Sequence, residues 1–269
     1  MKSIYTYWQM NWVALGAILL MTALYIGLQG FRIKKSFVFF LIALLLLALC
    51  FFSPLHVLSE EYLFSAHMIV HVVLLLIIGP LLVLSLQEGS ENNKVVTSIS
   101  KLLHKKPFIG WIIGVGIMWF WHLPFVFNYG MMAMHTNPGV SAIVHAAESI
   151  SLLIAGMLFS WPIISPVKQY RINALSGVVY LFTACIGCSL LGLLITFAPA
   201  GLYRHFLSAT DTIGLNAVIL NQWGINQTMD QQIAGLIMWV PCCLLYVMDA
   251  LYLLHKWFNE KELSVLEVN

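Results

Sequence analysis

Seven long apolar runs, separated by short polar segments, make up almost the whole chain. A helix needs about 20 predominantly apolar residues to cross the hydrocarbon core of a bilayer. The runs therefore predict seven transmembrane helices, at residues 10–29, 36–53, 62–86, 108–128, 139–161, 172–198 and 229–257. The predicted fold class is all-α: a polytopic membrane protein whose seven helices form one bundle, in a single domain that covers residues 1–269.

The residues at the ends of these runs support the assignment. Charged or turn-forming residues follow the first three runs, at residues 32–35, 53–54 and 87–90. Trp and Tyr lie near many of the ends, as expected of side chains that anchor a helix at the membrane interface. Residues 1–12 lack a compact basic region and a small-residue cleavage site, so we interpret the first run as a retained helix rather than a removed signal.

Composition supports an integral membrane protein. The chain is 61% hydrophobic and 9% charged, with a mean hydropathy of +0.90, whereas a soluble domain carries about 25% charged residues. There is no basic patch, so we expect membrane lipid and no nucleic acid as a partner. The five cysteines all lie within apolar runs, which argues against a disulfide framework.

The distribution of Lys and Arg predicts the orientation in the membrane, because these residues collect on the cytoplasmic side. With the N-terminus outside, the inner segments hold Arg32, Lys34, Lys35, Lys94, Lys101, Lys105, Lys106, Lys168, Arg171, Lys256 and Lys261. The outer segments hold only Lys2 and Arg204. We therefore expect the N-terminus outside and the C-terminus in the cytoplasm.

Five ionisable side chains lie at nearly the same depth inside three different runs. They are His67 and His71 in the third, His122 in the fourth, and His145 and Glu148 in the fifth. At about 1.5 Å of rise per residue, all five lie roughly 7–14 Å below the outer interface. Ionisable residues inside a membrane are costly and usually face the bundle interior, where they serve a function. The shared depth predicts one site built between helices.

The residue types in this group suit a metal ion. His67 and His71 are four apart, so they share one helix face, one turn apart. Imidazole nitrogens suit copper, zinc, iron and nickel. Glu148, three residues after His145, could coordinate the ion or orient an imidazole. His122 precedes Leu123-Pro124, and the proline is expected to end or bend the helix there. The alternative is a Glu148–His ion pair with a structural role alone.

Other polar residues on the outer face could join the site. Asp230 enters the seventh run at the same level, and we include it among the candidate metal ligands. His56 and His135 lie in short outer loops. The connection at residues 199–228, which contains His205 and Asp211, could fold over the site as a lid.

Sulfur-containing residues offer further candidates. The spacing of Cys185 and Cys188 is typical of thiol metal or redox motifs, although mid-membrane thiols are often simply small packing residues. The adjacent pair at residues 242–243 is a weaker signal. Met131, Met132, Met134 and His135 follow the fourth run, and their thioethers could pass Cu(I) inward or serve packing alone.

Several of these motifs together resemble one known family. The segments SAHMIVHVVLLLIIGPLLVL, MWFWHLPFVFN, VHAAESISLLIAGMLFSWPII and MDQQIAGLIMWVP are similar to the multi-span cytochrome c oxidase assembly factor CtaG of Gram-positive bacteria. The resemblance covers residues from about 55 to 255 and is carried by four motifs in order. They include His67 and His71 before Gly-Pro, His122 before a proline, His145 and Glu148 before Trp-Pro, and Asp230 before Ala-Gly and Met-Trp.

The resemblance implies a multi-pass protein of the bacterial plasma membrane that helps assemble a haem–copper oxidase. It implies an oxidase subunit as partner and copper as the cargo of a site that faces outward. On this reading the protein is not an enzyme, and the site is open to the outside so that ligands can exchange. The oligomeric state and the client subunit are left open.

Two other functions compete. Three histidines with an open position form a catalytic zinc arrangement, and Glu148 or Asp230 could act as general base in a seven-span membrane hydrolase. Alternatively, histidines of neighbouring helices could bind haem as axial ligands.

Overall fold

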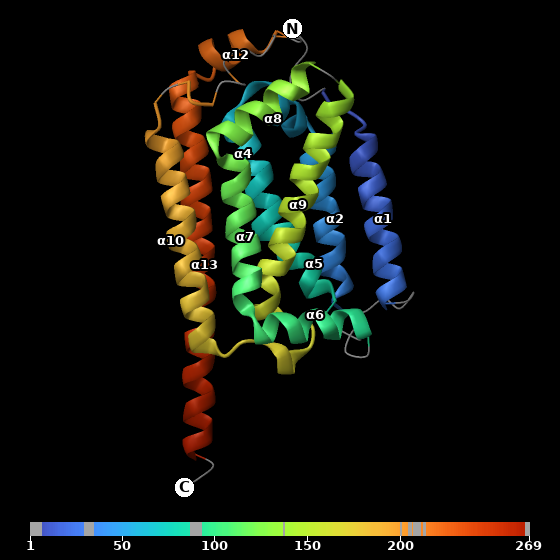
Figure 1. Ribbon diagram of the computed structural model, residues 1–269, viewed down its shortest axis with the longest axis vertical. Helices are drawn as coiled ribbons and strands as arrows, with labels where there is room; N and C mark the ends of the chain where they lie inside the picture. The colour runs from blue at the N-terminus through green and yellow to red at the C-terminus, as the bar shows by residue number, and fades with distance from the viewer. Residues whose placement is uncertain are drawn as a thin grey trace.

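The computed structural model describes residues 7–29, 35–86, 93–136, 138–199, 201–203, 206, 211 and 214–266, without the side chains of residues 131–138, 141–142 and 260–266. Every regular element in this part of the chain is a helix. Figure 1 shows most of the long helices running side by side along one axis, as expected of an all-α bundle.

Five helices are long and apolar enough to cross a membrane. They comprise α1 (Trp12–Gln29), the continuous segment Phe64–Ser85, most of α9 (Pro138–Ile164), α10 (Ala174–Phe197) and residues Gln227–Asn259 of α13 (Gln227–Leu266). Two bent helix pairs are long and apolar enough when each is taken together: α2 (Phe37–Phe52) with Pro54–Tyr62, and α7 (Pro107–His122) with Pro124–Gly130. Each pair is either one broken span or a re-entrant loop. The described residues thus contain five to seven spans, and the seven predicted runs each fall on one of them.

Prolines cause both bends. The helices diverge by 54° at Pro54 and by 64° at Pro124. Proline lacks the backbone N–H that a continuing helix needs, and its ring disfavours helical geometry in the residue before it. Pro54 begins α3 (Pro54–Val57), which continues as the π-helix η2 (Leu58–Tyr62), and Pro124 begins α8 (Pro124–Thr136). The expectation that Pro124 ends or bends the helix after His122 is confirmed.

The third span carries two of the candidate histidines and is held close to α9. It consists of α4 (Phe64–Val72), the π-helical turns of η3 (Val73–Ile78) and α5 (Gly79–Ser85). A Cβ atom on Gly79 would lie 2.7 Å from the carbonyl carbon of Gly156 in α9, so the two backbones touch at this crossing. Small residues allow such close packing in membranes, and the contact brings the start of α9 beside α4.

The helices α10 and α13 form the most extensive pair in the bundle. Gly192 and Gly235 face each other there: a Cβ on Gly192 would lie 2.8 Å from the Gly235 carbonyl oxygen. The N-terminal part of α13 also packs against α4. The helix is longer than the predicted run at residues 229–257, and its C-terminal part projects beyond the bundle in Figure 1.

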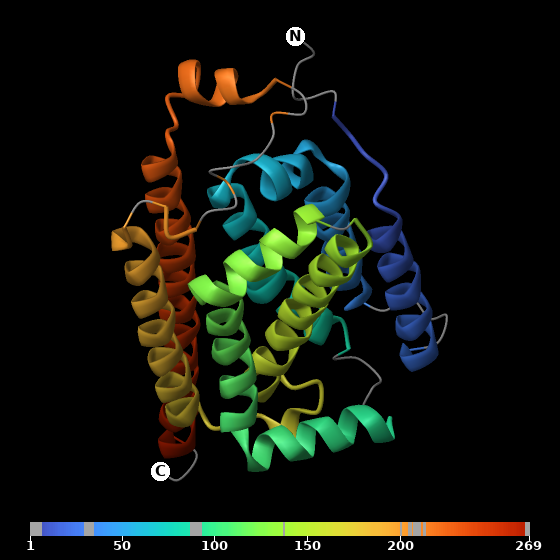
Figure 2. The same cartoon turned by 45° about the horizontal axis from the view of Figure 1, so that its top comes forward.

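One helix was not predicted. The helix α6 (Lys94–Lys105) lies across one end of the bundle, roughly perpendicular to the spans (Figure 2). Asn93 caps it by accepting hydrogen bonds from the amides of Val95 and Val96. Val96, Ser100 and Leu103 are buried on one face, while its lysines interrupt the apolar pattern that we used to find spans. Such amphipathic helices lie in the membrane interface.

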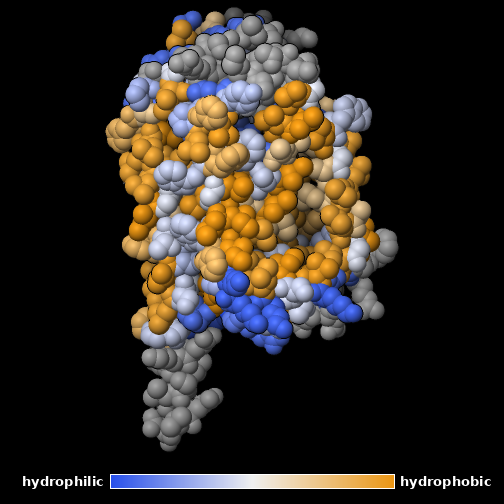
Figure 3. All heavy atoms as spheres, viewed as in Figure 1, coloured by the Kyte–Doolittle hydropathy of each residue, from blue (hydrophilic) through white to orange (hydrophobic). Residues whose placement is uncertain are grey.

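The surface of the protein matches a membrane position. Figure 3 shows apolar residues in orange along the middle of the visible face and hydrophilic residues in blue at its lower edge, over α6. The short 3-10 helix η4 (Lys168–Tyr170) lies at the same end, and α8 and α12 (Asn216–Asn221) lie at the other (Figure 1). Of the residues that predicted the orientation, Lys2, Arg32, Lys34 and Arg204 lie outside the described residues. The orientation stays a prediction.

Candidate metal centre

Three of the predicted site residues converge between α4 and α9. His67, His71 and Glu148 place ligand atoms within 4.8 Å of one another. The Oε1 atom of Glu148 lies 3.6 Å from His67 Nε2 and 3.4 Å from His71 Nε2. The rings of His67 and His71 lie one helical turn apart, tilted by 57° to each other, with centroids 4.1 Å apart. The i, i+4 spacing thus presents both imidazoles to one carboxylate of the neighbouring helix.

The spacing of these atoms suits a bound metal ion. With bonds of about 2.0–2.1 Å, the ligands of a tetrahedral ion lie about 3.3–3.4 Å apart. The observed separations of 3.4 and 3.6 Å are close to that value and long for direct hydrogen bonds. His67 Nε2 is buried and has no hydrogen-bond partner among the described residues. Because an unsatisfied buried polar atom is unfavourable, this nitrogen indicates a ligand between the three side chains.

His122 contacts this group through the His71 ring, and it is not one of the three clustered residues. Its Nδ1 lies against the Met118 carbonyl oxygen, which can only accept, so Nδ1 carries the proton. In the neutral ring, His122 Nε2 is then the acceptor for His71 Nδ1–H, 3.3 Å away. This chain leaves the lone pair of His71 on Nε2, the atom that faces Glu148. The structure places His122 beside the cluster, where its geometry suits an orienting role, and its role as a metal ligand stays a prediction.

Asp230, predicted as a ligand, has different partners. Its Oδ2 accepts a hydrogen bond of 2.7 Å from the Phe64 amide, and its Oδ1 accepts one of 3.0 Å from the Ser65 amide. These are the first two residues of α4, where helix amides lack intrahelical partners and the helix dipole favours a negative charge. Asp230 of α13 therefore caps the helix that carries His67 and His71, and it is not among the clustered ligand atoms.

His145 lies at the edge of the cluster. Its Nδ1 is 3.9 Å from Glu148 Oε2 and 3.9 Å from Oε1 of Glu60. Glu60 was not among the predicted residues. The signal was present: Ser53-Pro54 is a typical helix start, and a helix from Pro54 places His56 and Glu60 four apart on one face.

The cluster is enclosed, and the expectation of a site open to the outside is wrong in this structure. The side chains of His67, His71 and Glu148 are each 5% exposed. Phe127 packs edge-on against the ring of His67, and Phe206 covers it as well. The hydroxyl of Tyr203 donates a hydrogen bond to the His122 carbonyl oxygen. Tyr203 and Phe206 belong to the connection at residues 199–228, and these two described residues lie beside the site. The hypothesis that the whole connection forms a lid stays a prediction.

The remaining candidates lie elsewhere. Cys185 and Cys188 face α13, with Cys185 Sγ 2.9 Å from Cys243 Sγ, and all five thiols are free. Asp211 accepts hydrogen bonds from the Tyr62 hydroxyl and from the Leu215 amide. The side chains of Met131, Met132, Met134 and His135, and the whole of His205, lie outside the described residues.

Together, the apolar helices and the cluster define an all-helical, multi-pass membrane protein with a buried site of two histidines and one glutamate. The model of one family, described as cytochrome c oxidase caa3 assembly factor (Caa3_CtaG), matches residues 20–260. The chain belongs to this family, as its motifs predicted. Neither the comparison with curated proteins nor the comparison with solved structures found a match.

Proposed function

We propose that this protein binds a copper ion with His67, His71 and Glu148 and passes it to a subunit of a caa3-type cytochrome c oxidase during assembly. The family supports the role in oxidase assembly. The observation that carries the metal site is the buried Nε2 of His67, which has no hydrogen-bond partner among the described residues and faces a carboxylate oxygen shared with His71.

The surroundings of the site favour copper as the cargo. The thioether sulfur of Met68 lies 3.1 Å from His122 Nε2, inside the same group of imidazoles. Thioethers are soft ligands that bind Cu(I) well and zinc poorly. A buried sulfur beside the imidazoles therefore provides a donor that a zinc site does not need.

The proposed orientation places the site near the outer surface of the bacterial plasma membrane. The prediction from Lys and Arg puts α6 and η4 in the cytoplasm, which leaves α8 and α12 outside. A reporter fused after Asn269 should then be cytoplasmic. An external signal from that reporter would reverse the placement and remove the argument for copper delivery on the outer side.

The proposal is tested in a bacterium that makes a caa3-type oxidase and lacks its own family member. Expression of this chain should restore oxidase activity and the copper content of the purified oxidase, and the His67→Ala variant should restore neither. The His104→Ala variant is the control, because His104 lies on α6 at the other end of the bundle. Full oxidase copper in cells with His67→Ala would overturn the proposal.

A zinc hydrolase is the second candidate, since two histidines and a glutamate also form a catalytic zinc set. Phe127 and Phe206 enclose the site, and this enclosure favours a hydrolase over a copper carrier with an open site. Purified, zinc-loaded protein that hydrolyses lipid esters or amides, and loses this activity in Glu148→Gln, would support it. A bis-histidine haem fits less well, because His67 and His71 lie side by side on one helix rather than on opposite sides of a macrocycle.

A further inference from the structure

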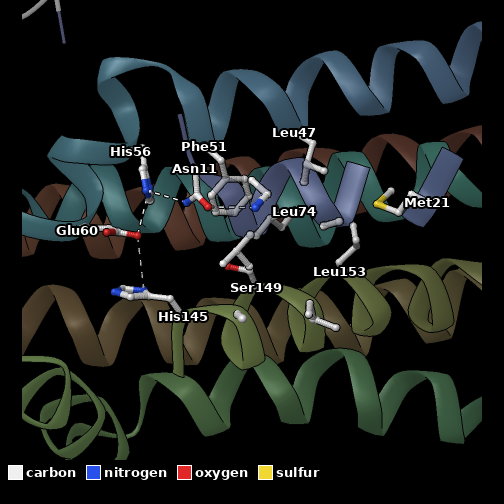
Figure 4. A pocket seen from close by; sticks show the side chains of 15 residues that line it. Asn11, Met21, Leu47, Phe51, His56, Glu60, Leu74, His145, Ser149 and Leu153 are labelled. Atoms are coloured by element: carbon white, nitrogen blue, oxygen red, sulfur yellow. Dashed lines mark hydrogen bonds and ion pairs between the residues drawn. The ribbon is translucent and has the colours of Figure 1, made fainter. Parts of the chain in front are cut away.

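A second group of polar side chains lies beside the buried cluster, at one end of a cavity. Oε1 of Glu60 is 3.2 Å from His56 Nδ1 and 3.9 Å from His145 Nδ1. The side-chain amide nitrogen of Asn11 is 3.0 Å from His56 Nε2. Figure 4 shows His56, Glu60 and His145 gathered at one end, with Leu47, Met21 and Leu153 toward the other. We call Asn11, His56, Glu60 and His145 the outer cluster.

The cavity gives the outer cluster access from the surface. Its volume is about 260 Å³, and it lies between α1, α2, η3 and α9. The side chains of Glu60 and His145 are 33% and 22% exposed, against 5% for Glu148. An ion or small ligand can therefore reach the outer cluster while the buried cluster stays enclosed.

Hydrogen bonding in the outer cluster directs a carboxylate toward His145. The Asn11 amide donates to His56 Nε2, so in the neutral ring His56 Nδ1 carries the proton and donates it to Glu60 Oε1. His56, which also lines the cavity, thereby fixes the orientation of Glu60. Glu60 Oε1 and His145 Nδ1, 3.9 Å apart, are close enough for one ion to contact both at about 2 Å from each.

His145 also connects the outer cluster to the buried one. The same Nδ1 atom lies 3.9 Å from Glu60 Oε1 and 3.9 Å from Glu148 Oε2. A single imidazole thus stands between the exposed carboxylate and the enclosed carboxylate. An ion held by Glu60 and His145 would need only to exchange Glu60 for Glu148 while it stays at the same His145 nitrogen.

We propose that Glu60 and His145 form a transfer site for a copper ion, which enters through the cavity and is passed to His67, His71 and Glu148. The inference rests on the proposed copper site and adds a route into it. Two protein ligands and partial exposure make the transfer site weak and quick to exchange, whereas three buried ligands retain the ion. The enclosure of the buried cluster makes such a route necessary.

The first experiment is calorimetric titration of the metal-free, full-length protein in detergent with Cu²⁺. The wild type should show two binding events per chain, one tight and one at least about tenfold weaker. Glu60→Gln should lose the weak event and keep the tight one. His67→Ala should lose the tight event and keep the weak one. Glu61→Gln is the matched control, because it removes the same charge one residue away and Glu61 does not line the cavity.

The second experiment measures how fast the buried site fills after rapid mixing with one equivalent of Cu²⁺, by absorbance. Glu60→Gln and His145→Ala should fill it at least about tenfold more slowly than the wild type and Glu61→Gln, and to the same final amount. Thermal unfolding of each variant checks that the fold is kept. The isosteric Glu60→Gln change carries the test if His145→Ala unfolds.

The outcomes separate the two proposals. A single binding event in the wild type, or filling of Glu60→Gln at the wild-type rate, would overturn the transfer site and leave the buried site standing. Absence of the tight event in the wild type would overturn the proposed function. The weak event in His67→Ala would then still support binding at Glu60 and His145.

Discussion

The buried cluster and the outer cluster use the same side chains, histidine and glutamate, but differ in their surroundings. Glu148 is held between two helices and is 5% exposed, whereas Glu60 borders a cavity and is 33% exposed. In each cluster a hydrogen bond to a neighbouring group fixes the orientation of one imidazole. The Met118 carbonyl oxygen holds the His122 ring, and the Asn11 side-chain amide holds the His56 ring.

The two clusters differ in the group to which each chain of hydrogen bonds leads. In the buried cluster the chain leaves a nitrogen lone pair of His71 facing Glu148, next to His67. In the outer cluster it ends on the Glu60 carboxylate. Burial strengthens electrostatic attraction and slows exchange, so we expect the same residue types to retain an ion in one place and to release it in the other.

The largest effect is expected from Glu148→Gln. Within the described residues, Glu148 is the one carboxylate that contacts both His67 and His71, and this change removes its charge. Changes to residues that merely orient metal ligands lower affinity by about 10–100-fold, so loss of a ligand should lower it by about 100-fold or more. Competition titration with a copper chelator measures this. An affinity within threefold of the wild type would remove the distinction between the two clusters.

His122→Ala should have the next largest effect. His122 accepts from His71 Nδ1 and contacts no carboxylate, so its loss frees the His71 ring to turn or to change tautomer. We expect copper affinity of the buried site to fall about 10–100-fold, with one tight ion still bound at saturation. Loss of the ion at saturating copper would make His122 a ligand instead of an orienting residue.

Asp230→Asn should act through the fold. The asparagine side chain has one acceptor oxygen, so it can accept only one of the two amide hydrogen bonds at the start of α4. It also lacks the negative charge that interacts favourably with the helix dipole. The expected loss is about 1–2 kcal/mol of stability, with copper affinity reduced about tenfold. Thermal unfolding followed by circular dichroism, with Asp249→Asn as control, measures the first effect. An unchanged unfolding temperature would argue that the cap is unimportant.

The sequence predicted the helices, and which residues gather at the site, better than it predicted the role of each residue. The apolar runs correspond to the spans because length and hydropathy decide whether a helix crosses a membrane. His67 and His71 were correctly paired, since their spacing alone puts them on one face. Glu148 lies at the same predicted depth in the membrane as these two histidines, which predicts that it meets them. The Gly79–Gly156 contact brings the two helices close together.

The roles that the sequence did not predict depend on packing between distant segments. The start of α4 has no side-chain cap of its own. The sequence around Asp230 does not reveal this, so it does not predict that Asp230 caps α4. The orienting role of His122 depends on which nitrogen meets the Met118 carbonyl. Enclosure of the site depends on Tyr203 and Phe206, which come from a connection with no periodic pattern.

The smallest effect is expected from Asn11→Ala, which tests the outer cluster alone. Asn11 begins the hydrogen-bond chain that runs through His56 to Glu60. One hydrogen bond contributes about 0.5–1.5 kcal/mol, so the weak copper event should weaken about two- to tenfold while the tight event stays unchanged. Calorimetric titration resolves the two events. An equal change in both would mean that the clusters act as one site, since a separate outer cluster requires that Asn11 affect only the ion it helps to hold.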